Sequence, residues 1–239
     1  MRILITNDDG ISSPVLPLLA TKLSELGEVT VVAPKMEQSG MSQAIDFSRE
    51  VEIKRVDLAP NVEAYAMDST PADCVRFGVT GLKKEYDLLI SGINKGYNLG
   101  DDIVYSGTIG AIFEGARLGL RGIALSTDFD NLIPSLAHWD AIYAFLKEKA
   151  LLSHHSLYNI NIPHTVKGFA ITRQGGMFYS DDFEYRGNDK YIQVGAPIEY
   201  DTCDLTVDID AIRHSYISIT PMTAARTDFV AFEKLKALQ

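Results

Sequence analysis

Cysteine is scarce in this chain of 239 residues, which contains only Cys74 and Cys203. Two thiols that need not pair are typical of a reducing compartment. The first apolar strand follows directly on Met1 and Arg2, which leaves no room for a secretory signal peptide. No apolar stretch approaches the roughly 20 residues that a membrane-spanning helix needs. We therefore expect a cytoplasmic protein without a membrane partner.

Runs of Lys or Arg are also missing, and the formal net charge is −10. A surface of this sign does not neutralise nucleic-acid phosphates, so DNA binding is not expected. The net charge does not exclude a small anionic ligand, because a metal ion and backbone N–H groups can supply positive charge locally.

Several catalytic signatures are absent. The chain has no GxxxxGK[ST] motif and no GxGxxG after the first strand, which argues against a P-loop NTPase and a Rossmann dehydrogenase. It has no HExxH, no zinc-type Cys/His spacing and no GxSxG nucleophile elbow. The five histidines lie outside the loops that follow the predicted strands, and we interpret them as surface or packing residues.

The N-terminus is the most informative stretch that is present. The apolar run Ile3–Ile5 predicts a buried strand, and it breaks at once into Thr-Asn-Asp-Asp-Gly. Ligands of open α/β sheets bind outside the carboxyl ends of the strands, where Asp8 and Asp9 would lie. Adjacent carboxylates repel each other unless a positive group such as a divalent cation lies between them. The alternative is that these aspartates, or Ser13, cap the next helix.

The apolar periodicity predicts alternating strands and helices. A helix ending before Gly27 and a strand at 29–33 complete a βαβ unit with the first strand. Further strands are expected at 87–91, 122–127 and 156–162, and helices are expected to start at Thr70-Pro71 and at Ser106 and to span 139–152. This pattern predicts a Rossmann-like, doubly wound α/β fold with a mainly parallel sheet. We interpret strands at 50–56 and 62–67 as an excursion beside that sheet.

The sequence changes character in its last third. Strands at 169–172, 191–194 and 216–220 enclose a polar, aromatic segment at 175–189, whose tyrosines and Phe178 would form a base-stacking wall or pack a subunit interface. We predict one domain over 1–239, with a core of 1–170 and a C-terminal β-hairpin extension and tail over 171–239. The closing segment 229–235 is amphipathic and would need a partner surface.

Two more loops follow strands at the same edge of the predicted sheet. The loop 35–48 contains Ser39-Gly40, where the Ser39 hydroxyl is either a neutral oxygen ligand, a phosphate donor or an ordinary turn residue. The stretch 92–110 contains five glycines, and a loop of this length inside a domain is usually functional. Asn94 is expected just past the strand end, where its carboxamide oxygen can point into the crevice.

Ser106, Gly107 and Thr108 open the next predicted helix. Small residues at a helix N-terminus expose backbone N–H groups to an anion, which is how many proteins bind phosphate. Plain N-capping by Ser106 is the alternative, and the two roles are compatible. Oxygen donors with few carboxylates suit Mg²⁺ or Mn²⁺ better than zinc.

These motifs together resemble the SurE (survival protein E) nucleotidases. The resemblance is carried by Asn-Asp-Asp-Gly, by Ser-Gly after the second strand, by Ser-Thr-Pro-Ala-Asp-Cys-Val and above all by Ser-Gly-Ile-Asn-x-Gly-x-Asn-x-Gly with Tyr-Ser-Gly-Thr. It extends from residue 1 to Thr220-Pro221. Ser69 departs from the glycine common in the family, but it lies outside the proposed metal shell.

The resemblance implies a metal-dependent phosphomonoesterase that acts on nucleoside 5′- and 3′-monophosphates, with short polyphosphate as a further substrate of some members. It implies one divalent ion, Mg²⁺ or Mn²⁺, per subunit, and a homodimer or homotetramer built through the C-terminal segment. By motif, the metal ligands would be Asp8, Asp9, Ser39 and Asn94. Asn98, Ser106, Gly107 and Thr108 would be the phosphate-binding or active-site positions.

The mechanistic hypothesis is a metal-activated water with Asp9 as base, in a catalytic set of Asp8, Asp9, Asn98 and Ser106. Two alternatives remain at this point. A haloacid-dehalogenase-type phosphatase would use an Asp nucleophile, but it needs acids two positions apart, and Asp8 and Asp9 are adjacent. A non-catalytic nucleotide-binding module would bind phosphate without releasing it.

Overall fold

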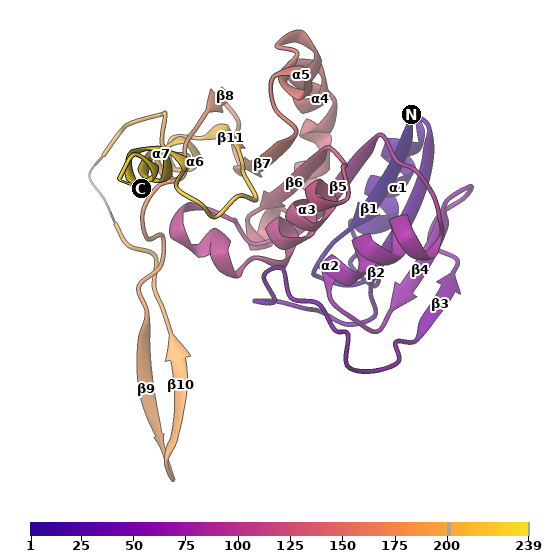
Figure 1. Ribbon diagram of the computed structural model, residues 1–239, viewed down its shortest axis with the longest axis horizontal. Coiled ribbons are helices and arrows are strands. Elements are labelled where there is room, and N and C mark those ends of the chain that lie inside the picture. Colours follow the sequence, from indigo (N-terminus) through magenta and orange to yellow (C-terminus); the bar gives the residue numbers. More distant parts are fainter. Residues whose placement is uncertain (200–201, 239) are drawn as a thin grey trace.

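The computed structural model describes residues 1–199 and 202–238, and within them a nine-stranded sheet has the order β3-β4-β2-β1-β5-β6-β7-β11-β8 (Figure 1). Strands β4, β2, β1, β5, β6 and β7 are parallel, whereas β3 and β11 pair antiparallel with β4 and β7. The mainly parallel sheet predicted from the sequence is confirmed. The strands are β1 (Arg2–Thr6), β2 (Glu28–Pro34), β3 (Ile53–Val56), β4 (Glu63–Met67), β5 (Leu88–Lys95), β6 (Gly122–Thr127), β7 (Leu157–Ile162), β8 (Gly168–Ile171) and β11 (Tyr216–Pro221).

Helices cover both faces of this sheet, as a doubly wound fold requires. Side chains on a strand alternate between the two faces. Ile3 and Ile5 of β1 belong to the core under α1 and α4, whereas Leu4 belongs to the core under α2 and α3. The four helices are α1 (Leu16–Ser24), α2 (Pro71–Arg76), α3 (Gly107–Arg117) and α4 (Trp139–Glu148).

The sheet is wider than the sequence predicted. Strand β4 pairs in parallel with β2, and β3 pairs with β4, so the predicted excursion at 50–56 and 62–67 is wrong. Strand β11, which we assigned to the extension, also joins the large sheet beyond β7, and so does β8, which spans the predicted boundary at 170. A strand's alternation shows that one of its faces is buried, but it does not show which strand lies beside it.

One predicted helix is divided in two. The helix expected over 139–152 is α4 followed by α5 (Leu151–His154). Ala150 between them has a left-handed backbone with φ of +49°. The apolar periodicity continues across this break, and it therefore gave no signal of the interruption.

The hairpin extension is confirmed. Strands β9 (Asp182–Gly187) and β10 (Lys190–Val194) form a separate antiparallel sheet that projects from the body (Figure 1). Phe178 at its base is buried against Leu99, Ile209 and Ile212 of its own chain.

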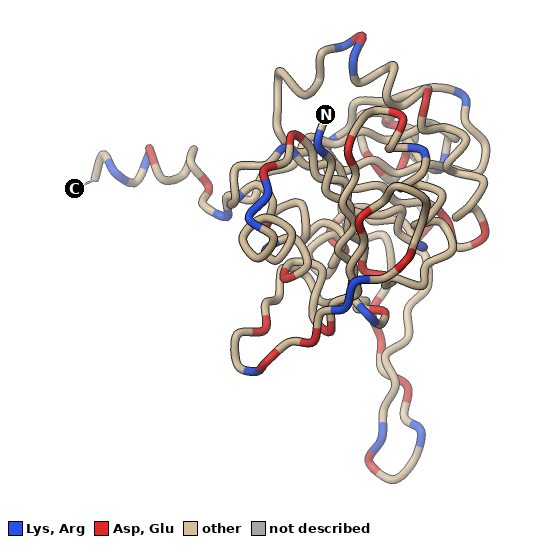
Figure 2. Tube along the Cα trace, turned by 90° about the vertical axis from the view of Figure 1, so that its right-hand side faces the viewer, with Lys and Arg blue, Asp and Glu red and all other residues tan. Residues whose placement is uncertain are grey.

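The C-terminal tail forms α7 (Phe229–Lys236), which buries none of its residues and leaves the body (Figure 2). In the described part of the chain, no helix combines the length and apolar character that crossing a bilayer requires.

Asp208 connects the C-terminal segment 171–239 to the stretch 92–110, which we call the glycine-rich loop. It lies at the start of α6 (Asp208–Arg213) and is 1% exposed. One carboxylate oxygen accepts from the Gly100 N–H at 3.0 Å, and the other accepts from the N–H groups of Gly175 and Ile209 at 2.8 Å each. Three backbone donors from separate segments thus converge on one buried carboxylate.

Replacing Asp208 by Asn should destabilise the protein by about 2 to 3 kcal/mol, because the amide turns one acceptor into a donor that faces a buried N–H group. Urea unfolding measures this change. Asp101→Asn, at an exposed carboxylate beside Gly100, is the control and should stay within about 0.5 kcal/mol. Equal unfolding free energies for the two variants would contradict this role of Asp208.

Candidate functional site

The two aspartates leave strand β1 in a turn that Asn7 shapes. The Asn7 side chain accepts from the Gly10 N–H at 3.1 Å and donates to the Gly10 carbonyl at 2.9 Å. Gly10 has φ of +91°, which favours glycine. The alternative that these residues cap α1 is wrong, because that helix begins at Leu16 and no side-chain cap is present. Asp8 and Asp9 are therefore free to serve the crevice at the end of the sheet.

Asp8 lies against the first turn of α3 and is 6% exposed. The Thr108 hydroxyl donates to Asp8 Oδ1 at 2.6 Å. A Cβ on Gly107 would lie 3.2 Å from Asp8 Oδ2, so the glycine allows this close approach. Burial raises the pKa of Asp8 to about 6, the hydrogen bond from Thr108 opposes that rise, and the charge of Asp9 adds to it. Asp8 is thus a buried carboxylate that favours a positive neighbour.

Asp9 is half-buried and reaches across to β5. Its Oδ2 accepts from the backbone N–H of Lys95 at 3.1 Å. Burial raises the pKa of Asp9, the Lys95 N–H lowers it, and the charge of Glu37 raises it again. Among the described residues, no ion pair includes Asp8 or Asp9. Neither carboxylate is therefore neutralised by a direct ion pair, although the charge of Lys95 lowers the pKa of Asp9.

The loop after β2 reaches the same site. The Gln38 N–H donates to the backbone carbonyl of Asp8 at 2.7 Å, which brings Ser39 beside the aspartates. Ser39 is exposed, and its hydroxyl donates to Glu37 Oε1 at 2.6 Å. A hydroxyl that donates its hydrogen in this way keeps its lone pairs for a cation. The sequence analysis did not identify Glu37. Its position two residues before the candidate ligand Ser39 could have indicated this contact.

Asn94 lies inside β5, and the prediction that it stands just past the strand end is wrong. The pairing of β5 with β6 is irregular between Ser91 and Asn94, and the strand continues to Lys95. The amide nitrogen of Asn94 donates to the Gly96 carbonyl at 2.8 Å. Its carboxamide oxygen is then the atom that can coordinate a metal ion. Its neighbour Lys95 contacts Asp9, so Asn94 lies at the same edge of the sheet.

Asn98 is buried in a polar network. Its amide nitrogen donates to Ser126 Oγ at 2.7 Å, and its backbone N–H donates to Asn161 Oδ1 at 2.9 Å. Its carbonyl accepts from the side chains of Asn159 and Asn161 at 2.8 and 2.9 Å. The network ties the glycine-rich loop to β6 and β7, and a role of Asn98 towards phosphate stays a prediction. Sequence reasoning missed its partners, whose signal was the Asn-Ile-Asn-Ile alternation of a buried strand.

Ser106 caps α3, as the plainer alternative held. Its hydroxyl accepts from the Ile109 N–H at 3.1 Å, and Gly107 and Thr108 occupy the first turn. The unpaired N–H groups of a first turn attract anions. The amide end of α3 and the Asp8 carboxylate thus lie next to each other.

The donor set fits a hard divalent cation. In the described residues, no group of three or more His, Cys, Asp or Glu side chains is placed to hold a metal ion, so a site here would draw on neutral oxygen donors as well. Two carboxylates with the Ser39 hydroxyl and the Asn94 carboxamide are oxygen donors of the kind that Mg²⁺ and Mn²⁺ prefer, with waters completing the shell.

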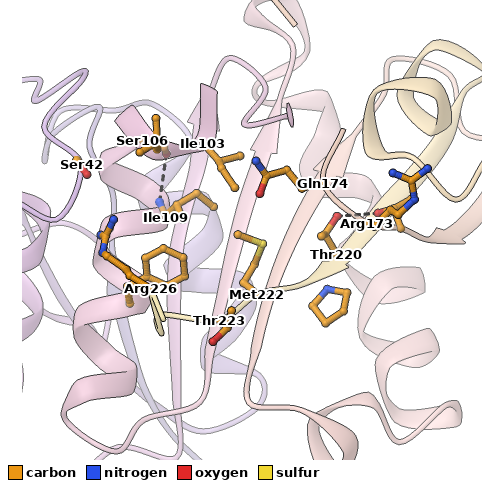
Figure 3. Close-up of a pocket in the computed structure, with 15 residues that line it drawn as sticks. Ser42, Ile103, Ser106, Ile109, Arg173, Gln174, Thr220, Met222, Thr223 and Arg226 are labelled. Carbon is orange, nitrogen blue, oxygen red and sulfur yellow. Dashed lines mark hydrogen bonds between the residues drawn. The ribbon is translucent and has the colours of Figure 1, made fainter. Parts of the chain in front are cut away.

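A pocket of about 410 Å³ lies beside α3 (Figure 3). Its walls include Ser106, Ile109 and Phe113 of α3, together with Met222 and Arg226 from the segment that leads to α7. These α3 side chains, apart from the cap, lie on a different helical face from Thr108. We therefore assign this pocket to the junction with the tail and not to the crevice of the aspartates.

Comparisons with known proteins show what this chain is similar to. The profile of the family described as Survival protein SurE matches residues 3–181. A 5′-nucleotidase SurE of Thermosipho melanesiensis is 40% identical over 248 residues, covering 99% of this chain and 96% of that protein. One of Legionella pneumophila is 36% identical over 253 residues, covering 100% and 97%. The crystal structure of the SurE protein from Aquifex aeolicus superposes with a TM-score of 0.81 at 31% identity, covering 100% of this chain and 99% of that chain.

Binding of Mn²⁺ should weaken as the pH falls through about 6, because the Asp8 carboxyl holds a proton below its raised pKa and the metal must displace it. The apparent Kd should rise about tenfold per pH unit below that value. Calorimetric titration of the metal-free protein between about pH 5 and about pH 8 measures it. In Asp8→Asn, which cannot bind this proton, the pH slope should shrink. A Kd that does not change over this range would contradict the assignment.

Proposed function

The chain belongs to the SurE family, and on this basis we propose that it is a metal-dependent 5′-nucleotidase that hydrolyses nucleoside 5′- and 3′-monophosphates to nucleoside and phosphate. The observation that carries the proposal is the contact of Asp8 with Gly107 and Thr108. The contact sets a carboxylate that we propose as a metal ligand against a helix N-terminus, and a cation beside such an N-terminus is the arrangement that a phosphate monoester needs. Short polyphosphate is a further candidate substrate.

We propose that one Mg²⁺ or Mn²⁺ ion per subunit is held by Asp8, Asp9, Ser39 and Asn94. Such an ion would supply Lewis acidity and lower the pKa of a water molecule. The contacts already present support this set. Asp8 is oriented by Thr108, Asp9 by the Lys95 N–H and Ser39 by Glu37, so each side chain has a fixed direction.

The chain's own groups would then act on the phosphate. The backbone N–H group of Gly107 would donate to its equatorial oxygens, where charge builds up during phosphoryl transfer, whereas the N–H group of Thr108 already serves the Asp8 carboxylate. Asp9, half-buried and with a raised pKa, is the candidate base that accepts the proton of the attacking water. Ser106 would position the first turn of α3 through its cap.

The alternatives are less well supported. An aspartyl-phosphate mechanism needs two acids that are two positions apart, and here Asp8 and Asp9 are adjacent. Trapping of a phosphoenzyme would favour that mechanism. A non-catalytic binding module would retain nucleotide without releasing phosphate. Metal-titrated hydrolysis of p-nitrophenyl phosphate, followed by a panel of nucleoside 5′- and 3′-monophosphates, separates these functions.

Asp9→Asn should lower turnover of adenosine 5′-monophosphate by about 100-fold or more at saturating Mn²⁺, because the amide cannot accept the proton of water. Phosphate release measures turnover, and urea unfolding should show little change. Asp57→Asn, at an exposed carboxylate far along the chain, is the matched control and should retain full activity. Full turnover of Asp9→Asn at saturating metal would remove Asp9 from its role as base.

We also propose that the protein forms a homodimer or homotetramer through its C-terminal segment. Helix α7 exposes Phe229, Phe232 and Leu235 and buries none of its residues within the chain. An amphipathic helix whose apolar side chains lie in water is stabilised by a second surface, and a second copy of the chain is the partner that the resemblance implies.

The double substitution Phe229→Asp/Phe232→Asp should dissociate this assembly, because it places charge in the apolar contact. Light scattering after size-exclusion chromatography should show a smaller mass than for the wild type. Glu233→Gln, on the same helix, is the control and should keep the wild-type mass. A wild-type monomer would contradict the proposed assembly, and an unchanged oligomer in the double variant would show that another surface forms it.

A further inference from the structure

Glu114 is a buried carboxylate on α3 that none of the steps above uses. It is 2% exposed. Its Oε1 accepts from the Arg117 guanidinium at 2.6 and 3.0 Å and from Arg76 at 3.4 Å. Its Oε2 accepts from the Gln43 side-chain amide at 3.0 Å. Burial works to raise the pKa of Glu114, but the hydrogen bonds from Arg117 and Gln43 lower it below its usual value, so the group stays ionised.

The partners of Glu114 divide into two kinds. Arg76 lies on α2, and Arg117 lies on α3. Because both bind Glu114, they hold the two helices together on one face of the sheet. Gln43 comes from the loop after β2 that carries Ser39. One oxygen of the carboxylate therefore neutralises its charge against the helices, and the other is available to the loop.

The same loop is seated on α3 at a second point. The Ser42 N–H donates to the Tyr105 carbonyl at 2.9 Å. The Ser42 carbonyl approaches Gly110 so closely that a Cβ there would lie 2.0 Å from it. Ser42 and Gly110 both line the pocket beside α3. The Gln43–Glu114 hydrogen bond thus fastens a segment that is already in backbone contact with the helix.

The two ends of this segment determine where Ser39 lies. At one end, the Gln38 N–H is bound to the Asp8 carbonyl, and at the other end Ser42 and Gln43 are bound to α3 and its neighbour. Only Ser39, Gly40 and Met41 lie between these anchors, and all three are exposed. Since these three residues are not packed against the body, their position depends on the hydrogen bonds of Gln38, Ser42 and Gln43 at the two ends.

We propose that Gln43 and Glu114 are positioning residues that hold Ser39 at the metal site, and that the affinity for the divalent cation depends on their hydrogen bond. This inference rests on the proposed function, which places Ser39 among the ligands. Residues that orient metal ligands from outside the shell typically change metal affinity by about 10- to 100-fold. Stability should depend on Gln43 far less, because Arg76 and Arg117 still neutralise Glu114 when the loop is released.

The test is Mn²⁺ binding to the metal-free full chain, measured from the electron paramagnetic resonance signal of free Mn²⁺. Gln43→Glu places a second carboxylate against Glu114 and should raise the Kd about tenfold or more, and Gln43→Ala should raise it less. In the double variant Gln43→Glu/Glu114→Gln, the carboxylate and the amide exchange places. The hydrogen bond is restored, and the Kd should return to within about threefold of the wild type.

Arg117→Gln is the matched control, since it removes a partner of the same carboxylate without touching the loop, and its Kd should stay within about twofold of the wild type. At saturating Mn²⁺, Gln43→Ala should recover turnover of adenosine 5′-monophosphate to within about threefold, which a residue of the reaction itself would not do. Urea unfolding of Gln43→Ala should match the wild type.

An unchanged Kd in both Gln43 variants, with a wild type that binds Mn²⁺ and hydrolyses the nucleotide, would overturn the inference and leave the proposed function standing. Weaker binding that is matched by global destabilisation of Gln43→Ala would overturn it as well, since the role would then be structural. A wild type that neither binds Mn²⁺ nor releases phosphate would overturn the proposed function itself. If the double variant does not fold, Gln43→Ala decides alone.

Discussion

The contact between the Asp8 carboxylate and the first turn of α3 is the constraint on which the site depends. Thr108 fixes one carboxylate oxygen, and Gly107 lets the helix approach the other. The shift of the Asp8 pKa from 3.8 to about 6 corresponds to roughly 3 kcal/mol that the ionised form costs at neutral pH. The divalent cation that we propose at this point would offset that cost. Packing between β1 and α3 holds this contact in place, because Leu4 of β1 and Ile112 of α3 belong to the same apolar core.

Around this contact, loops from distant parts of the chain are fixed mainly through their backbones. The Gln38 N–H binds the Asp8 carbonyl, and the Lys95 N–H binds the Asp9 side chain. Asp208 binds the glycine-rich loop through the Gly100 N–H. Because the donors in these contacts are backbone N–H groups, most side-chain oxygen atoms of the crevice are not used to hold the loops. The side chains of the crevice therefore remain available for a cation and a phosphate group.

The sequence predicts those parts of the fold and the site that depend on local signals. Two of these signals each lie within a few residues of the sequence. They are the break from the apolar run Ile3–Ile5 to Asp8 and Asp9, and the helix cap at Ser106. Parts that depend on distant partners were not predictable in this way. The place of β4 beside β2 is set by packing between strands whose patterns are alike, and the Gln43–Glu114 bond joins residues 71 positions apart. Asn94 was misplaced because an irregular pairing extends β5 past the point where its apolar run ends.

The most direct measurement of the central claim is anomalous diffraction from crystals of the protein grown with Mn²⁺. The account predicts one strong anomalous peak per subunit between the carboxylates of Asp8 and Asp9, with Ser39 Oγ and Asn94 Oδ1 completing the protein ligands. A crystal that binds Mn²⁺ elsewhere, and leaves this crevice without a peak, would contradict it.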